Sequence, residues 1–103
     1  MRLARGSDLT ACWERGRRWH TPCLDLAWRP SPAGHPRSAI VVARFQFTAV
    51  ARNRLRRRLR EILRRQLASL PAVDLVVRAN RAAYAASFAT LRGELLEGVM
   101  HVA

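Results

Sequence analysis

The sequence predicts an α/β two-layer sandwich, in which a small mixed sheet packs against helices. Short runs of apolar and β-branched residues at 38 to 44 and 73 to 78 have the composition of buried strands. Segments with apolar residues at helical spacing precede, separate and follow these runs. The chain has 103 residues and is 50% hydrophobic, which is enough for one two-layer core. We therefore expect a single domain over residues 1 to 103.

The first predicted element is a short helix over residues 7 to 15. Leu9, Cys12 and Trp13 are spaced so that they fall on one face of such a helix. Gly16 follows, which is typical of a helix end.

Two strands are predicted next, over residues 22 to 29 and 38 to 44. In the first, Leu24, Leu26 and Trp28 alternate with other residues, as in a half-buried strand. The second is a continuous apolar run, as in a central strand. Prolines and a glycine between the two runs predict a loop.

A long basic helix is predicted from Thr48, a candidate N-cap, to about residue 69, shortly before Pro71. Its most basic part, residues 52 to 66, contains eight arginines and one acid. The apolar residues of this part still fall on one helical face: Leu55, Leu59, Ile62 and Leu63. The helix should therefore bury its leucines against a core and present arginines on both flanks.

Residues 73 to 78 form the last predicted strand, and Ser87 is a candidate cap for a last helix. The apolar side of that helix consists of Phe88, Leu91, Leu95, Leu96 and Val99. The predicted order of elements is α-β-β-(β)-α-β-α, in which no residues are assigned to the bracketed strand.

The charge of the chain favours a polyanionic partner. Nineteen basic residues oppose seven acidic ones, which gives a formal net charge of +12, and every basic residue is arginine. The planar fork of arginine suits paired hydrogen bonds to phosphate. GC-rich coding sequence also raises the arginine content of proteins, but it does not explain the clustering of eight arginines in one helix. The predicted ligand of the basic helix is therefore a phosphate backbone.

The sequence contains no pattern typical of a catalytic or metal site. Cys12 and Cys23 are expected to be reduced thiols. His20 lies near Cys23 but lacks the second ligand pair of a zinc site, so we expect no metal bound by protein ligands alone. The seven acids are scattered along the chain, unlike the carboxylate cluster of a two-metal nuclease. Without a membrane-length apolar run or a signal peptide, the chain is expected to be cytoplasmic.

Residues 52 to 61 (RNRLRRRLRE) closely resemble the RNR signature of bacterial ribonuclease P protein subunits, R-N-R-x-K-R-x-x-R after Ala-Val and a variable residue. Here Ala-Val-Ala occupies residues 49 to 51, and Arg56 replaces the usual lysine. Further segments that resemble the family are residues 7 to 8, 15 to 17, 37 to 44 and 74 to 79. The resemblance implies the α/β sandwich of the family, with a left-handed βαβ crossover through the basic helix instead of the usual right-handed one.

The resemblance also implies a function, that of an accessory subunit of the endoribonuclease that removes the 5′ leader from precursor tRNA. In the bacterial enzyme the RNA subunit holds the catalytic Mg²⁺ ions, so no catalytic side chain is expected in this chain. The residues expected to bind the catalytic RNA are Arg52, Asn53, Arg54, Arg56, Arg57 and Arg60. Asn53 is the informative member, because a merely cationic surface needs no amide, although a residue that bonds the first helical turn would also explain it.

In the family, a cleft between the first helix and the sheet receives the single-stranded leader. The residues expected there are Leu9, Trp13, Arg17 and Arg44. The chain departs from the family around this cleft. Many relatives carry phenylalanine at Leu9 and a larger residue at Ala27, while Phe45 and Phe47 replace a usual lysine and glycine.

The implied partners are ribonuclease P RNA and precursor tRNA, with no DNA and no membrane. A ribosomal protein or RNA chaperone would share the charge and the fold class, but it would not require Asn53 at this spacing. A DNA-binding regulator would read bases with a mixed set of side chains instead of arginines at nearly all outward positions. A stand-alone nuclease would need the clustered carboxylates that the sequence lacks.

Overall fold

The computed structural model describes residues 6–43 and 45–102 of the chain. Its helices and strands, in chain order, are α1 (Gly6–Arg15), β1 (Arg17–His20), β2 (Leu24–Pro30), β3 (Arg37–Val42), α2 (Ala49–Gln66), β4 (Val73–Ala79) and α3 (Phe88–Val102). Two short 3₁₀ turns, η1 (Leu67–Ser69) and η2 (Arg81–Tyr84), flank β4. Every predicted helix and strand is present. The additional strand, β1, precedes the two strands that were predicted before α2, whereas the bracketed strand was predicted after them.

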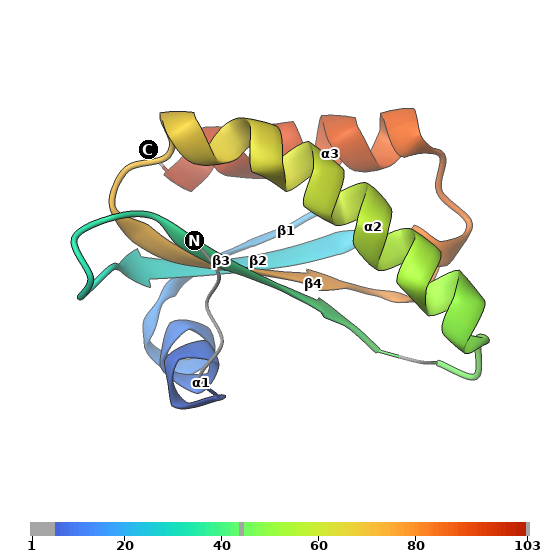
Figure 1. Cartoon of the computed structure of the whole chain (residues 1–103), viewed down its shortest axis with the longest axis horizontal. Coiled ribbons are helices and arrows are strands. Elements are labelled where there is room, and N and C mark those ends of the chain that lie inside the picture. The colour runs from blue at the N-terminus through green and yellow to red at the C-terminus, as the bar shows by residue number, and fades with distance from the viewer. Residues whose placement is uncertain (1–5, 44, 103) are drawn as a thin grey trace.

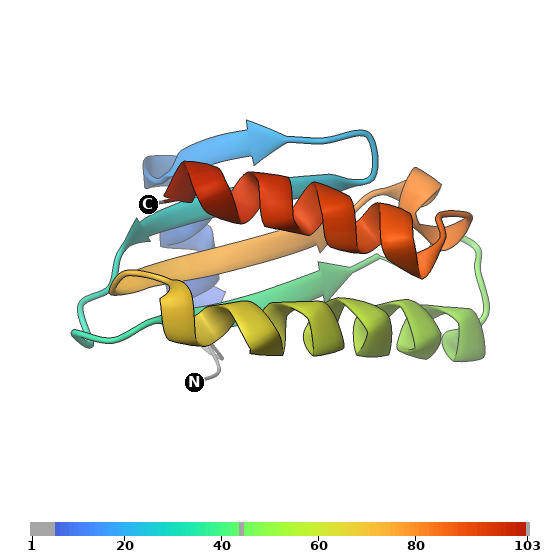
Figure 2. The ribbon, with the colours of Figure 1, turned by 90° about the horizontal axis from the view of Figure 1, so that it is seen from above.

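Within the described residues the sheet has four strands in the order β1-β2-β4-β3. β4 pairs antiparallel with β2 and parallel with β3, so the sheet is mixed, as predicted. β3 and β4 are connected through α2, which returns above the sheet (Figure 2). The turn of this connection is left-handed, which confirms the handedness that the family resemblance implied against the general preference.

Helices cover the two faces of the sheet unequally. α2 and α3 lie side by side on one face, and α1 lies on the other (Figure 1). The main core lies between the sheet and the helix pair, and includes Leu26, Leu75, Leu59, Leu91 and Leu95. A smaller apolar cluster lies under α1, where Cys12 and Val76 are buried and Leu9, Trp13 and Ala39 pack around them. No helix in the described parts of the chain combines the length and the apolar character needed to cross a membrane.

Gly16 lets the chain leave α1 close to the sheet. A Cβ atom at this position would clash with the carbonyl oxygens of Cys12 and Trp28. The lack of a side chain therefore allows β1 to begin directly after α1, which fixes α1 against the neighbouring β2.

A buried carboxylate joins three strands at one end of the sheet. Asp74 of β4 is 0% exposed and accepts two hydrogen bonds of 2.8 Å from Arg37 of β3 and one of 3.2 Å from Arg29 of β2. Burial acts to raise the pKa of Asp74, but the hydrogen bonds from Arg37 and Arg29 outweigh it and hold the pKa below its ordinary value. The paired carboxylate therefore stays charged and ties β2, β4 and β3 together.

Candidate RNA-binding surfaces

The basic helix α2 forms as its sequence predicts. The hydroxyl oxygen of Thr48 accepts a hydrogen bond of 3.1 Å from the backbone N–H of Ala51, which confirms Thr48 as the N-cap. The four predicted core residues Leu55, Leu59, Ile62 and Leu63 are buried. Most of the other positions from 54 to 65 carry arginines that lie away from this buried face, because a helix has 3.6 residues per turn.

One flank of α2 gathers four of the six residues predicted to bind the catalytic RNA. We call this set the docking flank: Asn53, Arg56, Arg57 and Arg60. Its three arginines make no ion pair with any residue that the structure describes. By contrast, Arg64 and Arg65 in the last turn lie 2.9 and 3.3 Å from Glu61. A hydrogen bond from Arg64 is the main reason that the pKa of Glu61 is lowered. The cations available to phosphate are therefore concentrated in the first two-thirds of the helix.

The other two predicted residues lie elsewhere on α2. Arg54 lies on the opposite flank, together with Arg58. Arg52 is half-buried, because it lies two helical turns before Leu59 and therefore on the side that faces the core. Its Nε atom is buried and has no hydrogen-bond partner among the described residues. Part of the Arg52 guanidinium group is thus buried, whereas Asn53, Arg57 and Arg60 are exposed.

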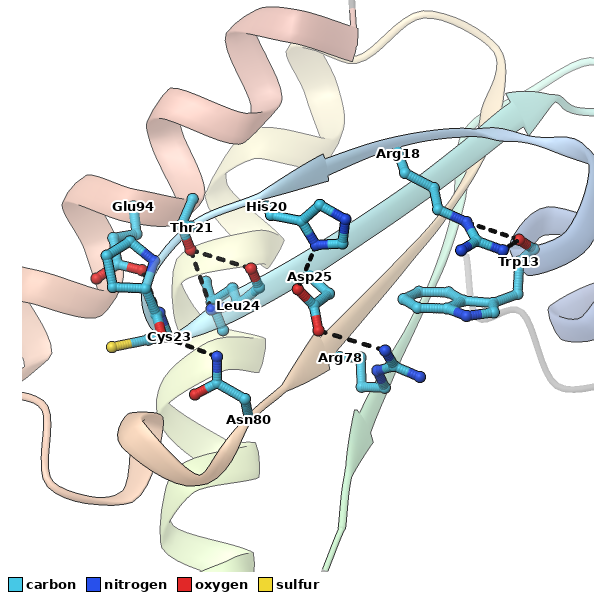
Figure 3. Close-up of polar contacts among 11 residues, drawn as sticks. Trp13, Arg18, His20, Thr21, Cys23, Leu24, Asp25, Arg78, Asn80 and Glu94 are labelled. Atoms are coloured by element: carbon cyan, nitrogen blue, oxygen red, sulfur yellow. Dashed lines mark hydrogen bonds and ion pairs between the residues drawn. The ribbon is translucent and has the colours of Figure 1, made fainter.

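A second polar surface lies on the face of the sheet that carries α1. The guanidinium carbon of Arg78 lies 4.0 Å from the centre of the Trp13 ring, and that of Arg18 lies 5.2 Å from it (Figure 3). Arg18 also donates a hydrogen bond of 2.9 Å to the carbonyl oxygen of Trp13. Cations so close to an indole ring are favourable cation–π contacts. The result is a planar aromatic group flanked by two arginines, which we call the Trp13 surface.

An acid orients one of these arginines. Asp25 accepts a hydrogen bond of 3.3 Å from Arg78, and its other oxygen lies 2.5 Å from Nδ1 of His20 (Figure 3). Asp25 and Arg78 are register partners in β2 and β4, and His20 is the partner of Asp25 in β1. Two arginines against one carboxylate leave the surface cationic. It therefore combines a stacking group with charge, the combination with which proteins hold single-stranded nucleic acid.

The residues predicted for the leader cleft do not all meet at the Trp13 surface. Trp13 lies at its centre, but Leu9 packs in the apolar cluster under α1. Arg17 is the register partner of the buried Trp28. Because side chains alternate along β1, Arg17 lies on the same face of the sheet as Trp19, which stacks on His101 of α3, and therefore on the face opposite the Trp13 surface. Its neighbour Arg18 contacts Trp13 instead. Arg44 lies outside the described residues.

Four residues of this surface were missed as site residues: Arg18, His20, Asp25 and Arg78. Asp25 lies between the apolar Leu24 and Leu26, and Arg78 ends the apolar run at 73 to 78, so both could have been expected to face outward. Their meeting depends on the pairing of β2 with β4, for which the sequence contains no local signal.

The remaining candidates for chemistry in this chain are possible metal ligands and the two cysteines. No three His, Cys, Asp or Glu residues within residues 6–43 and 45–102 gather into a potential metal site. Cys12 and Cys23 are both buried, and neither forms a disulfide. Burial, together with the neighbouring Glu94, raises the pKa of Cys23 to about 11, so its thiol stays protonated and unreactive. Glu94 itself accepts a hydrogen bond of 2.8 Å from the backbone N–H of Cys23 (Figure 3).

Comparisons with known proteins agree on one family. The sequence model of the family described as Ribonuclease P matches residues 1–102. The ribonuclease P protein component of Acidothermus cellulolyticus is 45% identical over 96 residues, which cover 90% of this chain and 80% of that protein. That of Desulfovibrio desulfuricans is 38% identical over 101 residues, which cover 93% of this chain and 78% of that protein.

The fold leads to the same family. The solved structure of the ribonuclease P protein from Thermotoga maritima superimposes with a TM-score of 0.87 at 27% identity, over 100% of this chain and 98% of that one. The Staphylococcus aureus ribonuclease P protein superimposes with a TM-score of 0.86 over 98% of this chain and 93% of that one. At 22% identity, this second likeness supports the fold alone.

Proposed function

The chain belongs to the ribonuclease P protein family, and on that premise we propose how its two surfaces serve the removal of 5′ leaders from precursor tRNA. The chain is the protein component of the endoribonuclease ribonuclease P, and it associates with ribonuclease P RNA. A ribosomal protein or a general RNA chaperone is not favoured, because the family match spans almost the whole chain.

The docking flank of α2 binds the catalytic RNA in this proposal. The observation that carries it is the set of exposed or half-exposed arginines on one side of a rigid helix, without ion pairs among the described residues, beside the amide of Asn53. Arginines in this arrangement neutralise neighbouring phosphates and release their counterions. The RNA then folds and binds substrate at a lower Mg²⁺ concentration, because less phosphate repulsion remains to be screened.

The Trp13 surface receives the single-stranded leader. Trp13 and the guanidinium planes of Arg18 and Arg78 offer flat groups on which bases stack, and the two arginines attract the leader phosphates. Asp25 holds Arg78 over the ring, so this part of the surface is oriented before the leader arrives.

We assign the bond-breaking step, and the Mg²⁺ ions that activate water for it, to the RNA subunit. Four acids of the chain already have partners that account for them structurally: Asp74 with Arg37, Asp25 with Arg78, Glu61 with Arg64, and Glu94 with the backbone of Cys23. The proposal includes a cytoplasmic location, since bacterial precursor tRNA is made and processed there.

A cleavage assay at low Mg²⁺ tests this function. Precursor tRNA is incubated with ribonuclease P RNA, with the protein, or with both. We expect cleavage at the mature 5′ end only when both are present. Cleavage by the protein alone would contradict the assignment of catalysis to the RNA. No stimulation of an active RNA by the folded protein would contradict the accessory role.

A further inference from the structure

A small hollow lies on the flank of α2 opposite the docking flank. It has a volume of about 180 Å³ and lies where the first half of α2 meets the turn before it and the 3₁₀ turn η2. Its lining consists of Phe47, Ala51, Arg54, Leu55, Arg58, Ala83 and Tyr84. The hollow thus combines two aromatic rings, a short aliphatic floor and two arginines.

The aromatic wall is held in place by the protein itself. The rings of Phe47 and Tyr84 are stacked, with centres 4.0 Å apart and planes 4° from parallel. The hydroxyl of Tyr84 donates a hydrogen bond of 2.5 Å to the carbonyl oxygen of Ala43, at the end of β3. Arg81 bonds the carbonyl oxygen of Phe45 at 3.4 Å and lies 6.0 Å from the Phe47 ring. These contacts hold a turn in which Phe45 and Gln46 adopt φ angles of 45° and 70°.

The two arginines of the hollow are not engaged by acids. Neither Arg54 nor Arg58 makes an ion pair with a described residue, and none of the residues that line the hollow is acidic. Farther along the same flank, Arg65 is paired with Glu61. The charge beside the aromatic wall is therefore available to an anionic ligand.

We propose that this hollow binds one unstacked nucleotide of the ribonuclease P RNA, with its base against the Phe47–Tyr84 pair and its phosphate on Arg54 and Arg58. Every base has a face that stacks on an aromatic ring, and arginine binds phosphate through paired hydrogen bonds. This inference rests on the proposed function and extends it, because RNA then contacts both flanks of the first half of α2.

Two substitutions separate stacking from charge. Phe47→Leu keeps an apolar side chain but removes the ring, so the affinity of the full-length protein for a ribonuclease P RNA transcript should fall roughly 5- to 100-fold. The dependence of affinity on salt should not change, because a stacking contact releases no counterions. Arg58→Gln should instead reduce the slope of log K against log salt by roughly 0.7.

Two control variants test whether the Phe47–Tyr84 pair only stabilises the fold. Tyr84→Phe removes the hydrogen bond to Ala43 but keeps the ring, so it should lower the melting temperature and reduce RNA affinity much less than Phe47→Leu does. Arg65→Gln removes a charge from the same flank outside the hollow. Chemical probing of unpaired bases in the RNA should show one nucleotide that is protected by the wild type, Tyr84→Phe and Arg65→Gln proteins. Phe47→Leu should leave this nucleotide reactive.

The outcomes distinguish this inference from the proposed function. If the wild-type protein does not bind the RNA, the proposed function fails. If the wild type binds but folded Phe47→Leu binds and protects the RNA equally well, only the hollow is excluded as a nucleotide site. If Phe47→Leu and Tyr84→Phe lose RNA affinity equally, and the losses parallel the decreases in melting temperature, the aromatic pair only stabilises the fold. That result would overturn the inference.

Discussion

Replacing Arg56, Arg57 and Arg60 together with alanine tests the docking flank directly. None of the three has an ion pair among the described residues, and alanine favours helix, so α2 should remain folded. Each phosphate contact contributes roughly 0.7 to 0.9 to the slope of log K against log salt. Loss of three contacts should therefore reduce the slope by about 2 to 3.

The same relation gives the loss of affinity. Counterion release vanishes near 1 M salt, so the binding curves of wild type and variant should converge there. At 0.1 M salt the variant should then bind ribonuclease P RNA roughly 100- to 1000-fold more weakly. The measurement is a titration of labelled RNA at four or five salt concentrations, with circular dichroism to confirm the fold.

A matched variant removes three other positive charges, with alanine at Arg64, Arg65 and Arg92. Its slope should change much less, because Arg64 and Arg65 are already paired with Glu61 and Arg92 lies on α3. An unchanged slope and affinity in the folded docking-flank variant would remove this flank from the interface. Equal changes in the two triple variants would show an effect of net charge without a defined surface.

Three further predictions concern single residues. Asp74→Asn should lower the free energy of unfolding by about 3 kcal/mol at pH 7, because it leaves Arg29 and Arg37 without their carboxylate. Since the folded-state pKa of Asp74 is lowered, this contribution is fully present above the unfolded-state pKa of about 3.9 and is lost as the pH falls through the folded-state value. Urea unfolding at several pH values checks it, and a pH-independent difference would contradict the charge argument. Thr48→Ala should cost about 1 kcal/mol in the same assay through loss of the N-cap, and no change would show that the cap bond is not made in solution. Trp13→Leu should weaken the binding of precursor tRNA to the holoenzyme roughly 5- to 100-fold but leave mature tRNA unaffected, and an equal effect on both would exclude a leader contact.

Much of the fold could be predicted from the sequence because its signals are local. The repeat of leucines between Leu55 and Leu63 predicted both the buried face of α2 and its cationic flanks, and Thr48 predicted where the helix begins. β1 was not located, because a four-residue strand of mostly polar residues has no alternation to recognise. Only its pairing with β2 identifies it as a strand.

The binding surfaces divide in the same way. Helical periodicity predicts that Arg56, Arg57 and Arg60 share one flank of α2, whereas Asn53 was singled out only through the resemblance to the family. The Trp13 surface joins α1, β1, β2 and β4, and its key contact between Asp25 and Arg78 depends on strand register. The hollow likewise depends on Tyr84, in an alanine-rich stretch for which no element was predicted. These two sites could not be predicted, because they depend on contacts between segments far apart in the chain, which a single sequence does not reveal.

The position of β4 in the sheet has a consequence for how the protein is made. β4 lies between β2 and β3, yet it follows both of them in the chain, and also α2. During synthesis on the ribosome, β2 and β3 therefore have no shared partner until β4 has emerged. The arginine-rich helix is complete before the strand that anchors its buried face exists. The segment that forms α2 is thus synthesised before the strand on which its buried face packs, so the helix reaches its native packing only after β4 has emerged.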